Sequence, residues 1–167
     1  ELRVEELAGA QKELADAQKR TEHQIQLLVK EGREIRGELG GLSRSVSYAL
    51  ENETYRLLPN VLKTNHGVEL HERLIRTDIG GKEINILGRA TKAGKEVLIV
   101  GEVKLRLDER RLKKKAIFDE LEEKVEAVKE AYNVQEIIRI LVTHYATRGF
   151  LKEARERDII VVQSFEW

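Results

Sequence analysis

The sequence predicts an α/β domain in which a mixed central sheet is flanked by helices, with a coiled-coil helix preceding it. Three observations predict this fold. Apolar residues recur at heptad spacing over residues 1–42, three strand-like runs separated by turn signals follow, and helix and strand patterns then alternate to residue 165. A meander gives antiparallel pairs and crossover helices give parallel ones, so both kinds of pairing are expected in one sheet.

Residues 1–40 are expected to form a coiled-coil oligomerisation helix. Apolar residues dominate two seam positions of a seven-residue repeat, and charged residues occupy the other faces. The seam positions hold Val4, Leu7, Gln11, Leu14, Gln18, Thr21, Ile25, Leu28, Gly32, Ile35, Leu39 and Leu42. We interpret the pattern as a two-stranded homodimer; the alternative is a long helix that folds back on its own domain. Gly40 and Gly41 mark the expected start of the second domain, residues 41–167.

The second domain is expected to open with a helix in "LSRSVSYALENETYRLLPNVLK". Ser43 is a candidate N-cap for it, and Pro59 should kink or end it. Strand-like runs follow at residues 69–79, 83–90 and 96–107. Gly80-Gly81 and the "KAG" at residues 92–94 are the turn signals between them. These runs predict a three-stranded meander.

The rest of the chain predicts two crossover units. Residues 108–132 form a long, charged amphipathic pattern, which is typical of a surface helix. An apolar strand is expected at residues 137–143, a helix at 147–157 and a last strand at 159–165. This order of elements completes the mixed sheet.

Composition excludes several classes of function. The chain has no cysteine, which removes thiol catalysis and thiolate metal sites, and its 30 basic and 30 acidic residues give no net charge. No apolar run approaches the roughly 18 residues that span a membrane, so we expect a soluble, cytoplasmic protein. Only 5% of residues are aromatic, which argues against a stacking platform for single strands. Abundant Glu, Lys and Arg without Cys or Met suits a thermophilic source.

The run "VLIVGEVKLRL" at residues 97–107 carries the most informative pair of charges. Alternate residues of a strand share a face, so Glu102 and Lys104 project from the same side. A carboxylate can hold Mg²⁺, and a lysine beside it can steady the charge that develops on a phosphate. This pair is a half-site for metal-assisted phosphodiester hydrolysis. An ordinary ion pair at a sheet end would have the same pattern.

Asn85 lies on the preceding strand, within "EINIL". Alternation puts Glu83, Asn85 and Leu87 on one face and Ile84, Ile86 and Ala90 on the other. If the two strands pair through the "KAG" turn, Asn85 and Glu102 come close together. The alternative is a local bond between the side chain and the backbone, or an exposed sheet end.

The first helix of the domain supplies a third polar candidate. Val46, Leu50, Leu57 and Val61 form its expected apolar stripe, and Glu53 falls within that stripe. A carboxylate on a buried stripe favours a functional role. The alternative is an ion pair with Arg73 or Arg76. Glu51 lies near the border of the stripe as a reserve candidate.

These features together resemble the PD-(D/E)XK nuclease superfamily, which has the restriction-endonuclease-like fold. The resemblance covers residues 42–167 and rests on a helix with an inward glutamate, a strand hairpin with a polar residue, and "GEVK" on the next strand. The segment "GKEINILGRATKAGKEVLIVGEVKLRL" is similar to the core of uncharacterised, mainly archaeal members that carry an N-terminal coiled coil.

The resemblance implies a role for each candidate. Glu102 is expected to be a metal-binding carboxylate, Lys104 the catalytic lysine and Glu53 the helix carboxylate of many members, with Mg²⁺ or Mn²⁺ as cofactor. Asn85 stands where the family usually has its metal-binding aspartate, and a neutral ligand should weaken Mg²⁺ binding. Three explanations remain open: the site is degenerate, Glu83 or Asp78 substitutes, or the residue was changed to disarm the enzyme.

A basic cluster follows the expected site directly. Its members are Arg106, Arg110, Arg111, Lys113, Lys114 and Lys115. Clustered Lys and Arg bind phosphates with salt-dependent, largely sequence-independent affinity, so we expect DNA as the partner; the alternative is a solvated helix start. The sequence therefore predicts a metal-dependent DNA nuclease that hydrolyses phosphodiesters as a homodimer. The alternative is a degenerate nuclease-fold module that binds DNA or a protein.

Overall fold

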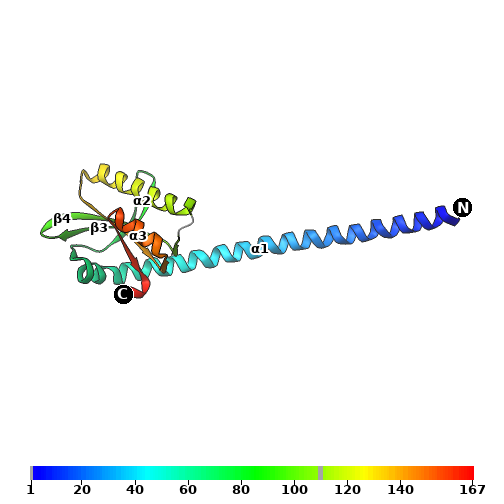
Figure 1. Ribbon diagram of the computed structural model, residues 1–167, viewed down its shortest axis with the longest axis horizontal. Coiled ribbons are helices and arrows are strands. Elements are labelled where there is room, and N and C mark those ends of the chain that lie inside the picture. The colour runs from blue at the N-terminus through cyan, green and yellow to red at the C-terminus, as the bar shows by residue number, and fades with distance from the viewer. Residues whose placement is uncertain (1, 109–110) are drawn as a thin grey trace. The chain divides into compact units, whose positions relative to one another are not determined.

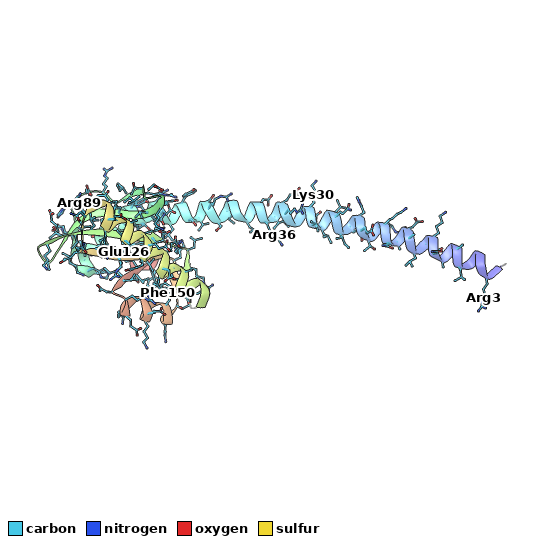
Figure 2. All side chains as sticks on the ribbon, turned by 90° about the horizontal axis from the view of Figure 1, so that it is seen from above. Arg3, Lys30, Arg36, Arg89, Glu126 and Phe150 are labelled. Atoms are coloured by element: carbon cyan, nitrogen blue, oxygen red, sulfur yellow. The ribbon has the colours of Figure 1, made fainter. Side chains whose placement is uncertain are left out.

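The computed structural model describes residues 2–108 and 111–167 (Figure 1). Its first element, α1, is a helix over Leu2–His66. The chain divides into two compact units, Glu1–Arg44 and Ser45–Trp167. The first unit is helical throughout its described residues, and side chains such as Lys30 and Arg36 project from it (Figure 2). The second unit contains every strand that the structure describes.

The second unit is built on a six-stranded sheet, which confirms the mixed α/β fold. Strands β1, β3, β4, β6 and β8 lie in that order, and β2 also pairs with β3. The bounds of these strands are Val68–Leu70 for β1, Ile75–Ile79 for β2, Lys82–Lys92 for β3, Lys95–Val103 for β4, Ile137–Thr143 for β6 and Ile159–Gln163 for β8. Pairs among β1 to β4 are antiparallel, whereas β6 runs parallel to both β4 and β8.

Helices cover both faces of this sheet (Figure 1). One apolar cluster joins the sheet to α2 (Arg111–Tyr132) and α3 (Arg148–Glu156), and it includes the stacked rings of Phe118 and Phe150. The second cluster joins the other face to the end of α1 through Leu50, Leu58 and Leu62. The sheet is therefore buried on both sides, as parallel strands require.

Strand β3 departs from simple alternation beside Asn85. Ile84 and Leu87 both belong to the cluster under α2, whereas Ile86 belongs to the cluster under α1. The expectation that Ile84 shares a face with Ile86 is therefore wrong. The cause is a β-bulge. Ile75 pairs with Leu87 and Thr77 pairs with Ile84, so β3 has one more residue than β2 between these two pairs. Such bulges re-aim side chains, and this one lies beside Asn85.

Helix α1 has no break where two were expected. It continues through Gly40, Gly41 and Ser43, so Ser43 is not an N-cap, and it also runs past Pro59 to His66. Each helical glycine costs only about 1 kcal/mol relative to alanine, and a proline removes a single hydrogen bond of the helix. Beyond Pro59, burial of Val61 and Leu62 against the sheet offsets that loss.

Most other bounds are close to those expected, with three differences. The run at residues 69–79 is divided into β1 and β2, and β4 ends at Val103 instead of reaching residue 107. A short parallel ribbon of β5 (Arg106–Leu107) and β7 (Tyr145–Ala146) was not predicted, because two-residue strands have no recognisable pattern. Within residues 2–108 and 111–167, no helix combines the length and apolar character needed to cross a bilayer.

Gly101 allows β4 and β6 to approach closely beside Glu102, and we predict that Gly101→Ala is destabilising. A Cβ atom there would lie 2.8 Å from the carbonyl oxygen of Ile140, which is backbone and cannot turn aside. The free energy of unfolding should fall by about 1–3 kcal/mol, measured by urea denaturation followed through Trp167 fluorescence. Gly37→Ala is the matched control, because nothing lies within 4 Å of its added Cβ. Equal stability of Gly101→Ala and wild type would contradict the packing argument.

Candidate active site

A polar cavity of about 660 Å³ lies at the end of β4. Four elements surround it: α1, the hairpin of β2 and β3, the end of β4, and α2. The residues that carry charge or an amide in its lining are Glu51, Arg76, Lys82, Glu83, Asn85, Glu102, Lys104, Arg106, Glu120, Glu123 and Lys124. The cavity therefore brings Asn85, Glu102 and Lys104 together, as the sequence predicted.

Glu102 is the most heavily bonded side chain of the cavity, with only 6% of its surface exposed. With its amide nitrogen turned toward the carboxylate, Asn85 donates to Oε1 at 2.6 Å and to Oε2 at 2.8 Å. Lys104 Nζ lies 3.2 Å from Oε1, and Lys124 donates to Oε2. Three donors from three elements thus satisfy one buried carboxylate.

The two lysines share a second carboxylate on α2. Lys104 Nζ lies 3.0 Å from Glu120 Oε2, and Lys124 Nζ lies 3.1 Å from Glu120 Oε1. Glu120 and Lys124 are one helical turn apart, so the helix itself sets their spacing. Two carboxylates and two ammonium groups form a closed network with no net charge.

Burial and mutual attraction shift the ionisation of this network in opposing directions. Burial raises the pKa of Glu102, although hydrogen bonding from Lys124 and the charge of Lys104 oppose the rise. Burial alone would lower the pKa of Lys104, but Glu102 and Glu120 together raise it. Burial would raise the pKa of Glu120, yet the two lysines hold it below its usual value. Lys104 is therefore held in its charged form.

A second charged group lies on the α1 side of the cavity. Arg76 of β2 donates to Glu51 Oε2 at 2.9 Å and also pairs with Glu83. Glu51 is 9% exposed, so this ion pair supplies the compensation that a buried carboxylate needs. Tyr55 donates to the backbone carbonyl of Asn85 at 2.7 Å and so ties α1 to the bulged strand.

The expectation that Glu53 lies on the buried face of α1 is wrong. Glu53 is exposed and pairs with Arg56 at 3.0 Å, whereas Glu51, the reserve candidate, lines the cavity. The predicted apolar stripe included Val46, which is exposed, and Leu57, which is only half-buried. The buried positions are Leu50, Glu51, Thr54, Leu58, Val61 and Leu62, which rotates the stripe away from Glu53.

The substitutes considered for a missing aspartate are already engaged. Glu83 lines the cavity but pairs with Arg76. Asp78 accepts a hydrogen bond from the backbone nitrogen of Gly81 at 3.1 Å and so closes the hairpin turn. Neither carboxylate takes the place opposite Glu102 that Asn85 holds.

The basic cluster is described only in part. Arg106 and Lys115 are exposed, and Arg106 lines the cavity. Its guanidinium lies 5.5 Å from the ring centre of Tyr145. Arg110 lies outside the described residues, and so do the side chains of Arg111, Lys113 and Lys114.

Sequence reasoning missed Glu120 and Lys124. Lys124 is 7% exposed and lies between Leu121 and Val125 on the face of α2 that packs on the sheet. A lysine inside an apolar helical stripe was the available signal for it. Glu120 had no comparable signal, because it is one of many acidic residues on a charged helix.

The donor set does not fit a divalent metal ion in this arrangement. Mg²⁺ takes oxygen ligands, but the Glu102 carboxylate is engaged by two ammonium groups, and Asn85 offers only an uncharged amide beside it. Among the described residues, no group of three or more His, Asp or Glu side chains could hold a metal ion. The charge that a metal would neutralise is already neutralised by lysine.

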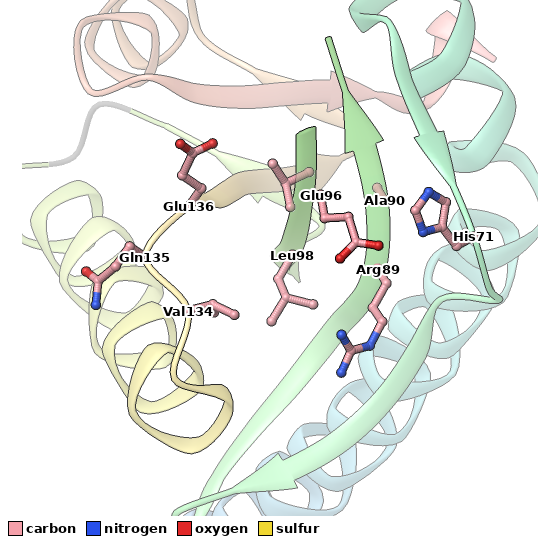
Figure 3. A pocket seen from close by; sticks show the side chains of 9 residues that line it. His71, Arg89, Ala90, Glu96, Leu98, Val134, Gln135 and Glu136 are labelled. Carbon is pink, nitrogen blue, oxygen red and sulfur yellow. The ribbon is translucent and has the colours of Figure 1, made fainter. Parts of the chain in front are cut away.

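A second cavity, of about 270 Å³, lies at the opposite end of β4. Figure 3 shows Arg89 and Glu96 on its strand wall, with Val134, Gln135 and Glu136 on the segment that leads into β6. Two of its charged side chains have partners nearby: Arg89 Nε lies 3.9 Å from Glu72, and Glu136 lies 3.6 Å from Lys95 Nζ. This cavity does not contain any of the residues predicted for the active site.

Two solved structures resemble the chain at low sequence identity. One is a repair endonuclease from Pyrococcus abyssi, with 20% identity and a TM-score of 0.48 over 71% of this chain and 46% of that one. The other is a complex of EndoMS with double-stranded DNA, with 21% identity and a TM-score of 0.47 over 70% of this chain and 44% of that one. The chain thus spans less than half the length of either protein. No curated protein matches it.

One family model matches residues 52–166. The match takes in the whole described sheet and the residues Asn85, Glu102, Lys104 and Lys124, and it begins one residue after Glu51. The chain therefore belongs to the family described as a domain of unknown function (DUF8196).

Proposed function

We propose that this protein is a DNA-binding domain with a nuclease-type fold and that it does not cut DNA. The observation that carries the proposal is the state of Glu102, whose carboxylate is held by Asn85, Lys104 and Lys124. A buried carboxylate with all its partners supplied from the same chain has little capacity left for a metal ion. The cavity itself, with the exposed Arg106 in its lining, could still receive a phosphate backbone.

DNA as the partner is supported by the resemblance to PD-(D/E)XK nucleases and by local charge. The whole chain has no net charge, so affinity must come from cations gathered in one place. Arg106 at the cavity and Lys115 in the first turns of α2 are exposed. Contacts of this kind position a nucleic acid without reading its sequence.

The second candidate is an active, metal-dependent endodeoxyribonuclease. It is favoured by the convergence of Glu51, Asn85, Glu102 and Lys104 on one cavity. In such an enzyme Mg²⁺ or Mn²⁺ would supply an activated water. Lys104, held in its charged form, would stabilise the negative charge that develops on the phosphate.

We also propose that the helix of the first unit dimerises the protein as a coiled coil. Leu7, Leu14, Leu28 and Ile35 of the heptad seam are all more than half exposed in the single chain. A seam of this length needs a partner to bury it, and a second copy presents the same pattern. Dimerisation would present two DNA-binding domains together and raise their joint affinity.

A plasmid nicking assay with Mn²⁺ distinguishes the two candidates, using wild type, Asn85→Asp, and Lys104→Ala. We expect wild type to leave the plasmid intact and Asn85→Asp to nick it, because a second carboxylate opposite Glu102 adds negative charge beyond what Lys104 and Lys124 neutralise, and this excess attracts Mn²⁺. Adding Lys104→Ala to Asn85→Asp should abolish the nicking. Nicking by wild type that is lost with Lys104→Ala would instead establish the active nuclease.

The contribution of the exposed cations is measurable through the salt dependence of DNA binding. Replacing Arg106 and Lys115 by alanine should weaken binding to duplexes of any sequence and reduce the slope of log affinity against log salt by about 1 for each contact. Fluorescence anisotropy at several salt concentrations gives the slope. Lys95→Ala, at the opposite end of β4, is the matched control. An unchanged slope in the double variant would place the DNA elsewhere.

Two adjacent leucines test the coiled coil. Leu28 lies in the heptad seam and is 66% exposed, whereas Leu27 lies outside the seam and is 47% exposed. Leu28→Glu should convert a dimer to a monomer, because it places like charges opposite each other in the interface. Leu27→Glu should leave the mass unchanged. Light scattering after gel filtration measures both, and a wild-type monomer would refute the dimer.

A further inference from the structure

Lys124 is a buried cation that the resemblance to nucleases does not assign. Its side chain is 9% exposed, and it reaches the cavity from the face of α2 that packs against the sheet. Burying an ammonium group costs several kcal/mol unless it is paired and hydrogen-bonded. Lys124 is paired twice, with Glu102 of β4 and with Glu120 of its own helix.

The ammonium group of Lys124 bridges two carboxylates, those of Glu102 and Glu120. Its Nζ contacts oxygens of two carboxylates that belong to different elements, and Asn85 and Lys104 hold Glu102 from other directions. Arg76 pairs with both Glu83 and Glu51, and Lys82 pairs with Glu123 at 2.6 Å. The whole lining carries five acidic and five basic side chains, so its formal charges sum to zero. The cavity therefore has little uncompensated negative charge with which to attract a divalent ion.

We propose that Lys124 is the built-in cation of this site, which holds Glu102 and Glu120 together and keeps divalent metal ions out. The inference deepens the proposed function, since it names the residue that makes the site stable without a metal. It depends on the charge balance of the cavity and not on DNA. Its test is therefore a measurement of metal binding and stability.

A purely structural ion pair would behave differently from a cation that excludes metal. In both cases, removing the ammonium leaves a buried carboxylate with one partner fewer, which lowers stability. If Lys124 is the cation that keeps metal ions out, its removal leaves a place that a metal ion can fill, because the metal supplies the positive charge that was lost. The two roles thus differ in whether Mn²⁺ restores stability.

The experiment compares full-length wild type with Lys124→Met and Lys129→Met. Methionine keeps the unbranched shape of lysine without its charge. Lys129 is the matched control, because it lies on the same helix and pairs with the exposed Glu126, away from the cavity lining. Mn²⁺ binding is measured by the loss of the free-ion electron paramagnetic resonance signal, and thermal unfolding is measured in EDTA and in Mn²⁺.

We expect Lys124→Met to bind Mn²⁺ at least about tenfold more tightly than wild type, since a neighbouring positive charge is gone. Its Tm should fall by several degrees in EDTA and recover in Mn²⁺, whereas wild type and Lys129→Met should show neither effect. Equal Mn²⁺ affinity in wild type and Lys124→Met overturns the proposal. A fall in Tm that Mn²⁺ does not reverse also overturns it, in favour of a structural ion pair.

The double variant Glu102→Gln with Lys124→Met keeps the proposal testable if the single variant does not fold. It removes both charges, so it should be more stable than Lys124→Met alone and should bind Mn²⁺ no better than wild type. Tight Mn²⁺ binding by the double variant would place the metal away from Glu102 and refute the inference. Plasmid nicking by wild type would contradict the proposed function separately, through an assay that this experiment does not use.

Discussion

The burial of the Glu102 carboxylate is the constraint on which the rest of the site depends. A carboxylate this deeply buried requires donors, and they come from β3, from the residue after β4, and from α2. These contacts join the hairpin to the crossover helix across the sheet. The end of β4 is consequently held by polar bonds as well as by apolar packing, and the position of each donor is set by the strand or helix that carries it.

Two backbone features make that arrangement possible. Gly101 lets β6 lie close to β4, and this proximity places Glu102 at the wall of the cavity with Val103 and Lys104 beyond it. The bulge on β3 breaks alternation around Asn85, while Tyr55 anchors its carbonyl from α1. Neither feature contributes a charged group. Both determine how closely the charged groups of the cavity approach one another.

The sequence predicted features that depend on a local pattern of residues, such as the strands. It did not predict contacts between residues that are far apart along the chain. Alternation and turn signals located β3, β4 and β6, and they were enough to bring Asn85 near Glu102. Glu53 was chosen over Glu51 because the phase of a helix depends on which apolar residues are buried, and Val46 is not. Lys124 lies twenty-two residues from Glu102, so its role depends on how α2 packs, which periodicity alone does not reveal.

The cavity at the end of β4 holds several carboxylates, whose negative charges must be compensated. Two acids facing each other repel unless a cation lies between them, and a bound metal is one such cation. Here the residue beside Glu102 on β3 is an amide, Asn85. The ammonium groups of Lys104 and Lys124 neutralise Glu102 and Glu120, so these four charges are balanced without a ligand. A balanced set of charges attracts a divalent metal ion weakly, while Arg106 on the cavity lining stays exposed to solvent. Under the proposed function, binding of a phosphate backbone and its hydrolysis would be separable properties, and Asn85 and Lys124 are the residues that would separate them.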